Sequence, residues 1–128
     1  MKERRQLAPK PNPAARPKLF AISEEMKEWS AMLVSEVAKW PRVHSKPMFG
    51  LVSFYRNSKV FAAIPRTRAV ASPHSIIFKF HKENAETRKA RRQLQEYPAM
   101  RWLAFELRSE KDLGAALRWF DIAYRVAR

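Results

Sequence analysis

Cysteine is absent from this chain of 128 residues, which excludes disulfide bonds, thiolate metal ligands, iron–sulfur clusters and cysteine nucleophiles. Glycine is almost absent as well. The two glycines, Gly50 and Gly114, are too far apart to form a phosphate-binding loop or a dinucleotide-binding motif. The longest apolar run, residues 60–64, is far shorter than the ~20 residues of a membrane helix. These absences argue against several classes of nucleotide-dependent enzyme and against a membrane-spanning helix.

Acidic residues are scarce compared with basic ones. The chain has 26 Lys and Arg against 12 Asp and Glu, a formal net charge of +14. The excess is concentrated in residues 1–18, with a net charge of +5, and in residues 42–92, with twelve basic residues against two glutamates. This segregation predicts a surface of positive potential, which attracts polyanions and weakens with salt. The alternative is that the charge only keeps the protein in solution.

Residues 1–18 are predicted to form a flexible basic arm, and residues 19–128 a single domain. Four of the nine prolines lie in the arm, whose apolar content is too low to pack into a core. The arm has no apolar stretch typical of a secretory signal, so we expect a cytoplasmic protein. Its candidate contacts to a phosphate backbone are Arg4, Arg5, Lys10 and Arg16.

The hydrophobic pattern after the arm predicts an α+β domain. Ser23 and the two glutamates that follow are typical of a helix start, and apolar residues then recur at helical spacing as far as Trp40, before Pro41. Strands are expected at residues 46–55, 60–65, 75–80 and 100–107. Residues 84–95 fit a solvated helix or a loop, and Ser109 marks the start of a closing helix. We therefore expect an antiparallel sheet of about four strands, with the N-terminal and C-terminal helices packed on one face.

Several short stretches resemble known families. Residues 46–50, Lys-Pro-Met-Phe-Gly, the Phe-Ala pair at 61–62 and the Ile-Phe-Lys run at 77–79 resemble the N-terminal domain of TfoX. The helix–strands–helix order, with Trp102 in the last strand and Tyr124 in the last helix, is similar to the MmcQ/YjbR group. The C-terminal half also resembles small uncharacterised luciferase-like domains. The resemblance implies a small α+β domain that associates with nucleic acid, without enzymatic activity and with a role in regulation.

Basic residues of the middle of the chain form the candidate binding site. They follow the second expected strand, surround the third, or lie in the segment 84–95: Arg66, Arg68, Lys79, Lys82, Arg88, Lys89, Arg91 and Arg92. On a helix, Arg88 lies three and four residues from Arg91 and Arg92, so these three charges share one face. We expect the set to converge on one surface that binds nucleic acid or another polyanion through phosphate contacts. A solvated helix face is the alternative.

Aromatic residues are predicted to lie mostly in the core, because their spacing follows the apolar faces. Tyr55 and Trp119 are the expected exceptions, available to stack on unpaired bases. His74 and His81 flank one expected strand at an odd spacing, so they point to opposite faces and cannot share a metal ion.

No metal site, cofactor or pair of catalytic carboxylates is predicted, and we expect a protein without enzymatic activity. Two other interpretations stay open at this point. One is a protein-interaction domain for an acidic partner, and the other is a small-molecule or enzymatic domain with a pocket between the sheet and the terminal helix. A monomer and a homodimer formed through an exposed sheet edge are both compatible with the sequence.

Overall fold

The computed structural model describes residues 18–97 and 102–128. The predicted basic arm therefore lies outside the described residues except for Lys18, as do residues 100 and 101 of the last expected strand. The elements in chain order are β1 (Leu19–Ala21), α1 (Glu24–Val37), β2 (Val43–Met48), β3 (Leu51–Arg56), β4 (Lys59–Pro65), β5 (Arg68–Val70), β6 (Ser75–Phe78), α2 (Ala85–Arg91), β7 (Gln95–Tyr97), β8 (Trp102–Glu106) and α3 (Asp112–Arg125).

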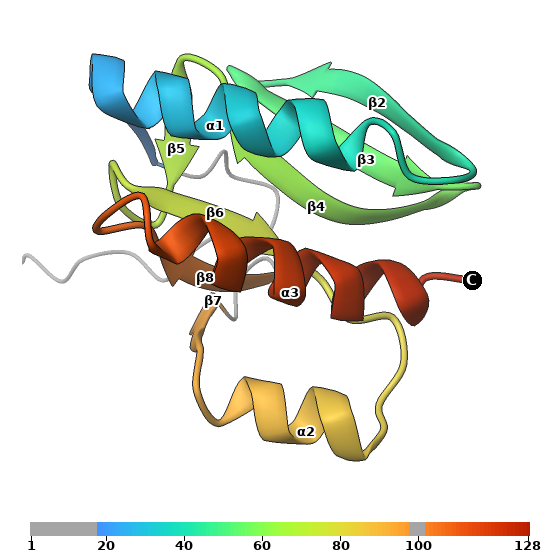
Figure 1. Ribbon diagram of the computed structural model, residues 1–128. Helices are drawn as coiled ribbons and strands as arrows, with labels where there is room; N and C mark the ends of the chain where they lie inside the picture. The colour runs from blue at the N-terminus through green and yellow to red at the C-terminus, as the bar shows by residue number, and fades with distance from the viewer. Residues whose placement is uncertain (1–17, 98–101) are drawn as a thin grey trace, which may run out of the picture.

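The protein has an α+β fold with a larger sheet than expected (Figure 1). Six strands form one antiparallel sheet in the order β2-β3-β4-β6-β8-β7, and β1 pairs with β5 in a separate two-stranded sheet. The prediction of about four strands was too low because β1, β5 and β7 have only three residues each. So short a segment leaves little periodicity in the sequence.

Helix α1 begins as its sequence predicts. The Ser23 hydroxyl accepts a hydrogen bond from the Met26 N–H at 3.0 Å, and two glutamates lie in the first turn. The cap satisfies a main-chain donor that the helix itself cannot, and the glutamates suit the positive end of the helix dipole. The helix ends at Val37, so Trp40 follows it instead of belonging to it.

The strand predicted at residues 46–55 is wrong, because two strands, β2 and β3, occupy this region and are joined by a tight turn. Phe49 and Gly50 form the turn with φ angles of 50° and 85°. Left-handed angles of this kind favour glycine, so Gly50 reverses the chain where the hydrophobic pattern alone predicted a continuous strand. The polar residues 56–59, which separate the expected strands at 46–55 and 60–65, form the turn that joins β3 to β4.

The second half of the domain contains a short capped helix and a later start for the last one. Asn84 and Thr87 form a reciprocal capping box at α2, which settles segment 84–95 as a seven-residue helix followed by β7. The expected helix start at Ser109 is wrong by two residues, because Lys111 occupies the N-cap position of α3. The Asp112 carboxylate instead accepts hydrogen bonds from the main-chain N–H groups of Arg108 and Ser109.

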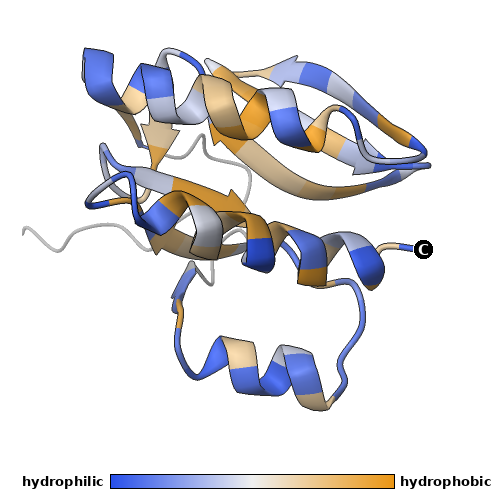
Figure 2. Ribbon diagram, viewed as in Figure 1, coloured by the Kyte–Doolittle hydropathy of each residue, from blue (hydrophilic) through white to orange (hydrophobic). Residues whose placement is uncertain are grey.

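The central strands β4 and β6 are buried on both faces of the sheet. Helices α1 and α3 lie side by side, contact β4 and each other, and share one apolar core with side chains such as Phe54, Phe78 and Leu103 (Figure 1). A second, smaller cluster of buried apolar side chains includes Ile77 of β6 and Val70 of β5. Figure 2 shows β4 and β6 as largely hydrophobic and α2 as largely hydrophilic. No helix within the described ranges is both long enough and apolar enough to cross a bilayer.

Candidate polyanion-binding surface

One continuous part of the chain carries positive charge without any acidic residue. Residues 42–82, here called the acid-free stretch, form β2 to β6 and supply four adjacent strands of the main sheet. The stretch contains eight cations: Arg42, Lys46, Arg56, Lys59, Arg66, Arg68, Lys79 and Lys82. Because the stretch has no carboxylate of its own, the four strands bring together cations without adding acids, which favours the approach of anions.

The turn between β4 and β5 presents two of the predicted arginines. The main-chain N–H groups of Arg66, Thr67 and Arg68 all donate to the Gly50 carbonyl oxygen, at 2.9, 2.9 and 3.2 Å. The side chains of these three residues are exposed. The Arg68 side chain also covers Gly50, since a Cβ built at Gly50 would lie 2.8 Å from Arg68 Cγ. The glycine turn between β2 and β3 therefore fixes where Arg66 and Arg68 emerge from the fold.

Lys46 lies on the edge strand β2 and contacts an aromatic ring. Its ammonium group lies 5.2 Å from the centre of the Tyr55 ring, and His44 stacks on the same ring at 5.3 Å with an interplanar angle of 6°. No carboxylate of the described residues forms an ion pair with Lys46. Tyr55 is half-buried, so the expectation that it departs from the core holds only in part.

Arg56 and Lys59 have internal partners. Arg56 donates to the Tyr124 carbonyl oxygen at 2.9 Å and lies 4.3 Å over the Tyr124 ring. Lys59 donates to the Arg128 carbonyl oxygen at 2.9 Å. Both cations join the β3–β4 hairpin to the end of α3. They are less available to a ligand than the exposed cations of the same stretch.

The predicted cluster on α2 is partly used inside the fold. Arg91 forms ion pairs with Glu83 and Glu96 and lies 5.4 Å over the Phe80 ring. Its expected role as a phosphate contact is therefore not supported by its surroundings. The other three basic residues of the cluster are exposed, and none forms an ion pair with a carboxylate of the described residues: Arg88, Lys89 and Arg92.

Arg125 of α3 links this helix to α2 through Glu86. Its guanidinium donates to both carboxylate oxygens of Glu86, at 2.9 and 3.2 Å, and to Asp121 at 3.0 Å. The hydrogen bond with Glu86 is the main reason that the pKa of Arg125 is raised, against a smaller lowering by desolvation. Glu86 is thus committed to Arg125 and forms no ion pair with the neighbouring cations of α2.

The predicted site residues fall into two separate groups. Arg66 lines a cavity together with residues of α1, whereas α2 lies beyond α3 in Figure 1. Lys79 is half-buried after β6, and Lys82 is exposed between β6 and α2. In Figure 1 α3 lies between α1 and α2, so the arrangement of the helices gives no support to the expectation that all eight cations converge on one surface. The four arm residues, Arg4, Arg5, Lys10 and Arg16, lie outside the described residues.

Trp119 does not behave as the expected exposed aromatic residue. It is half-buried and stacks on Phe78, with ring centres 6.4 Å apart and an interplanar angle of 7°. It also meets the edge of Phe105 at 6.2 Å. The residue lies off the main stripe of α3 but packs against β6 and β8, so the expectation that it departs from the core holds only in part.

Each of the three histidines has different surroundings. His44 stacks on Tyr55, His74 is exposed, and the His81 ring nitrogen Nε2 lies 2.6 Å from the Val60 carbonyl oxygen. No cluster of three metal-ligating side chains occurs in the two segments that the structure describes.

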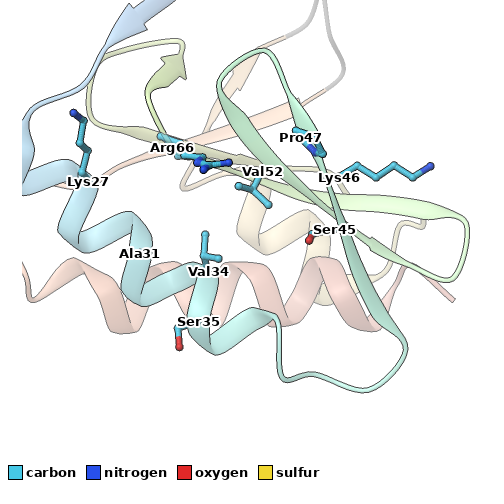
Figure 3. A pocket seen from close by; sticks show the side chains of 10 residues that line it. Lys27, Ala31, Val34, Ser35, Ser45, Lys46, Pro47, Val52 and Arg66 are labelled. Carbon is cyan, nitrogen blue, oxygen red and sulfur yellow. The ribbon is translucent and has the colours of Figure 1, made fainter.

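A groove of about 510 Å³ opens between α1 and the β2–β3 end of the sheet (Figure 3). We call it the α1–β2 groove, and its lining consists of Lys27, Ala31, Val34, Ser35, Ser45, Lys46, Pro47, Val52, Pro65 and Arg66. In Figure 3, Val34 and Val52 point toward each other from the two walls, whereas Ser35 and Lys46 point away.

Sequence reasoning missed most of this groove. The pocket expected between the sheet and the terminal helix has a counterpart in two smaller cavities of about 350 Å³, one between β8 and the start of α3 and one between β3 and the end of α3. The larger groove lies instead beside the first helix. Lys27, Ala31, Val34 and Ser35 are three or four residues apart on α1 and share one flank. That spacing was a usable signal. It is masked by the stronger apolar stripe next to it, and the opposite wall depends on the β2–β3 turn, which the sequence pattern did not predict.

Comparison with known proteins gives no relative: no family model, no curated protein and no solved structure matches this chain.

Proposed function

We propose that this protein is a non-enzymatic binding domain that associates with nucleic acid through phosphate contacts, in a regulatory role. The observation that carries the proposal is the acid-free stretch, eight Lys and Arg residues without a carboxylate across four neighbouring strands. Lys46, Arg66 and Arg68 are the exposed cations of this surface that we expect to contact phosphates first. We expect the three cations of α2 and those of the arm to add further phosphate contacts.

The physical basis is electrostatic attraction combined with counterion release. A nucleic acid backbone carries a regular row of negative charges and a layer of condensed cations, which bound Lys and Arg side chains displace. Such contacts fix position without reading base sequence. Arg66 and Arg68 are well suited to them, because a guanidinium donates two parallel hydrogen bonds to one phosphate group.

Two triple variants test which cations bind. K46A/R66A/R68A removes three charges from the acid-free stretch, and R88A/K89A/R92A removes three from α2, so the two proteins have the same net charge. Binding of fluorescein-labelled duplex DNA, single-stranded DNA and RNA is measured by anisotropy at about 50 and 200 mM salt, a range over which phosphate contacts weaken strongly. The slope of log affinity against log salt is negative, and we expect it to become shallower by about 3 units in the first variant, near 0.9 for each lost phosphate contact.

The α2 variant should lose less affinity than the variant of the acid-free stretch. Equal losses would mean that net charge alone governs binding and would remove the assigned surface. Absence of binding to all three nucleic acids at the lower salt would refute the proposed function. Polyglutamate is the competitor that represents an acidic protein partner. If it displaces nucleic acid at equal charge concentration, phosphate recognition is refuted in favour of general attraction to acidic chains.

A further inference from the structure

The α1–β2 groove exists because α1 covers only part of the sheet. The buried side of α1 packs toward β4 and α3, through residues such as Trp29 and Leu33. The sheet continues past the helix to the edge strand β2. The helix-facing side chains of β2 and β3 near Pro47 and Val52, which are direct cross-strand partners, are therefore covered by α1 from one side only.

Half of the ten residues that line the groove are apolar. Ala31 and Val34 line it from α1, and Pro47, Val52 and Pro65 line it from the sheet. Val34 and Val52 are only partly buried although both pack against the core. A ligand that covers this exposed apolar surface is stabilised in the groove by about 25 cal/mol for each Å² removed from water.

The cations of the groove are placed at its rim, with no acid lining it. Arg66 forms no ion pair or hydrogen bond through its side chain within the described residues. Lys27 has a partner in Glu24, at 3.2 Å on the exposed side of α1. In Figure 3 the Arg66 guanidinium lies beside Val52, so a charged group and an apolar wall are available to the same ligand.

We propose that the α1–β2 groove binds a small carboxylate with an apolar body, of the class of a medium-chain fatty acid. The apolar chain lies between Val34 and Val52, and the carboxylate pairs with Arg66. A guanidinium and a carboxylate match in a planar, two-bond geometry, which favours this head group over a neutral one. The volume of about 510 Å³ lies within the range of roughly 300–1,000 Å³ that small-molecule sites have. This inference goes beyond the proposed function and does not depend on it.

Titration calorimetry with decanoate and decan-1-ol tests the two parts of the site separately, because the ligands share a chain and differ in charge. Decanoate should bind at least tenfold more tightly than decan-1-ol. The variant R66M should remove this difference, a loss of about tenfold to a hundredfold for decanoate, in line with the strength of a hydrogen bond to a charged group. Its binding of decan-1-ol should stay unchanged.

A matched pair of tryptophan variants tests the location. A31W places a large side chain on the wall of the groove, and M32W adds the same residue at a position of α1 that is 52 % exposed and outside the lining. Ala31 is exposed, so the substitution does not enter the core. We expect A31W to lose decanoate binding and M32W to keep it, with unchanged far-ultraviolet circular dichroism in both.

Two outcomes would overturn the inference: absence of decanoate binding to the wild-type protein, or equal binding to A31W and M32W. A31W should keep the wild-type affinity for nucleic acid, because it removes no cation. The nucleic acid titration therefore tests only the proposed function, and the decanoate titration tests only the groove, so either proposal can be refuted without the other.

Discussion

Substitution of Gly50 by alanine should weaken both the fold and the binding surface. Gly50 has a φ of +85°, a left-handed conformation that costs an L-residue about 1–2 kcal/mol. The added Cβ would lie 2.8 and 2.9 Å from Arg68 Cγ and Cβ, and 2.9 Å from Thr67 Oγ1. These distances are shorter than van der Waals contact, and overpacking of this kind costs about 1–3 kcal/mol.

The two effects together predict that Gly50→Ala lowers the free energy of unfolding by about 3 kcal/mol. For a domain of this size each kcal/mol corresponds to about 4 °C in the thermal midpoint, so the midpoint should fall by about 12 °C. Urea unfolding followed by circular dichroism gives the free energy directly, and thermal unfolding gives the midpoint.

The other glycine provides the control. Gly114 lies in α3, and a Cβ built there would have its nearest contact at 3.9 Å, with Arg118 Nη1. Gly114→Ala should therefore stabilise the protein by about 0.5–1 kcal/mol, because alanine is the better helix former. The same substitution at the two glycines is thus expected to have opposite signs. A Gly50→Ala protein with the wild-type midpoint would refute the role of the turn.

Binding provides a second measurement on the same variant. The Gly50 carbonyl oxygen holds the N–H groups of the turn that carries Arg66 and Arg68. A turn displaced by the new Cβ should present these arginines differently and lower the affinity for nucleic acid, measured well below the unfolding temperature of both proteins. Wild-type affinity in a destabilised Gly50→Ala protein would contradict the placement of the two arginines in the binding surface.

Three further variants and one control variant, Arg88→Met, test the contacts of α2 and α3. Asn84→Ala removes the side-chain cap of α2 and should cost about 1 kcal/mol, detected as faster amide hydrogen exchange within that helix. Arg91→Met should lower stability by about 1 kcal/mol, whereas Arg88→Met should not, because only Arg91 has ion pairs and a ring contact; equal thermal midpoints would contradict this difference. Tyr124→Phe should cost about 0.5–1.5 kcal/mol in urea unfolding, because its hydroxyl donates to a main-chain carbonyl oxygen at 2.8 Å.

Long elements with a regular pattern were predictable from the sequence. Helix α1 follows from its Ser23 cap and the three- and four-residue spacing of its buried side chains, all within one stretch of chain. Strands β4 and β6 follow from dense β-branched and aromatic residues. The α+β class then follows from the order of these elements.

Short elements and turns were not predictable in the same way. The turn at Gly50 interrupts a run that reads as one strand, and only its left-handed angle shows that the chain reverses there. The three-residue strands β1 and β5 are held by each other, across about fifty residues of sequence. A pairing between distant segments leaves no local pattern to read.

The amino-acid sequence by itself determined how much positive charge the chain carries and that none of its acids lies between residues 42 and 82. Charge and the absence of acids are properties of composition and need no coordinates. Only the tertiary structure decided that Arg91 is held by glutamates, that Arg66 stands free beside an apolar groove, and that α2 lies apart from both. Those facts depend on which distant side chains the sheet and helices bring together, because electrostatic and packing forces act through space and not along the chain.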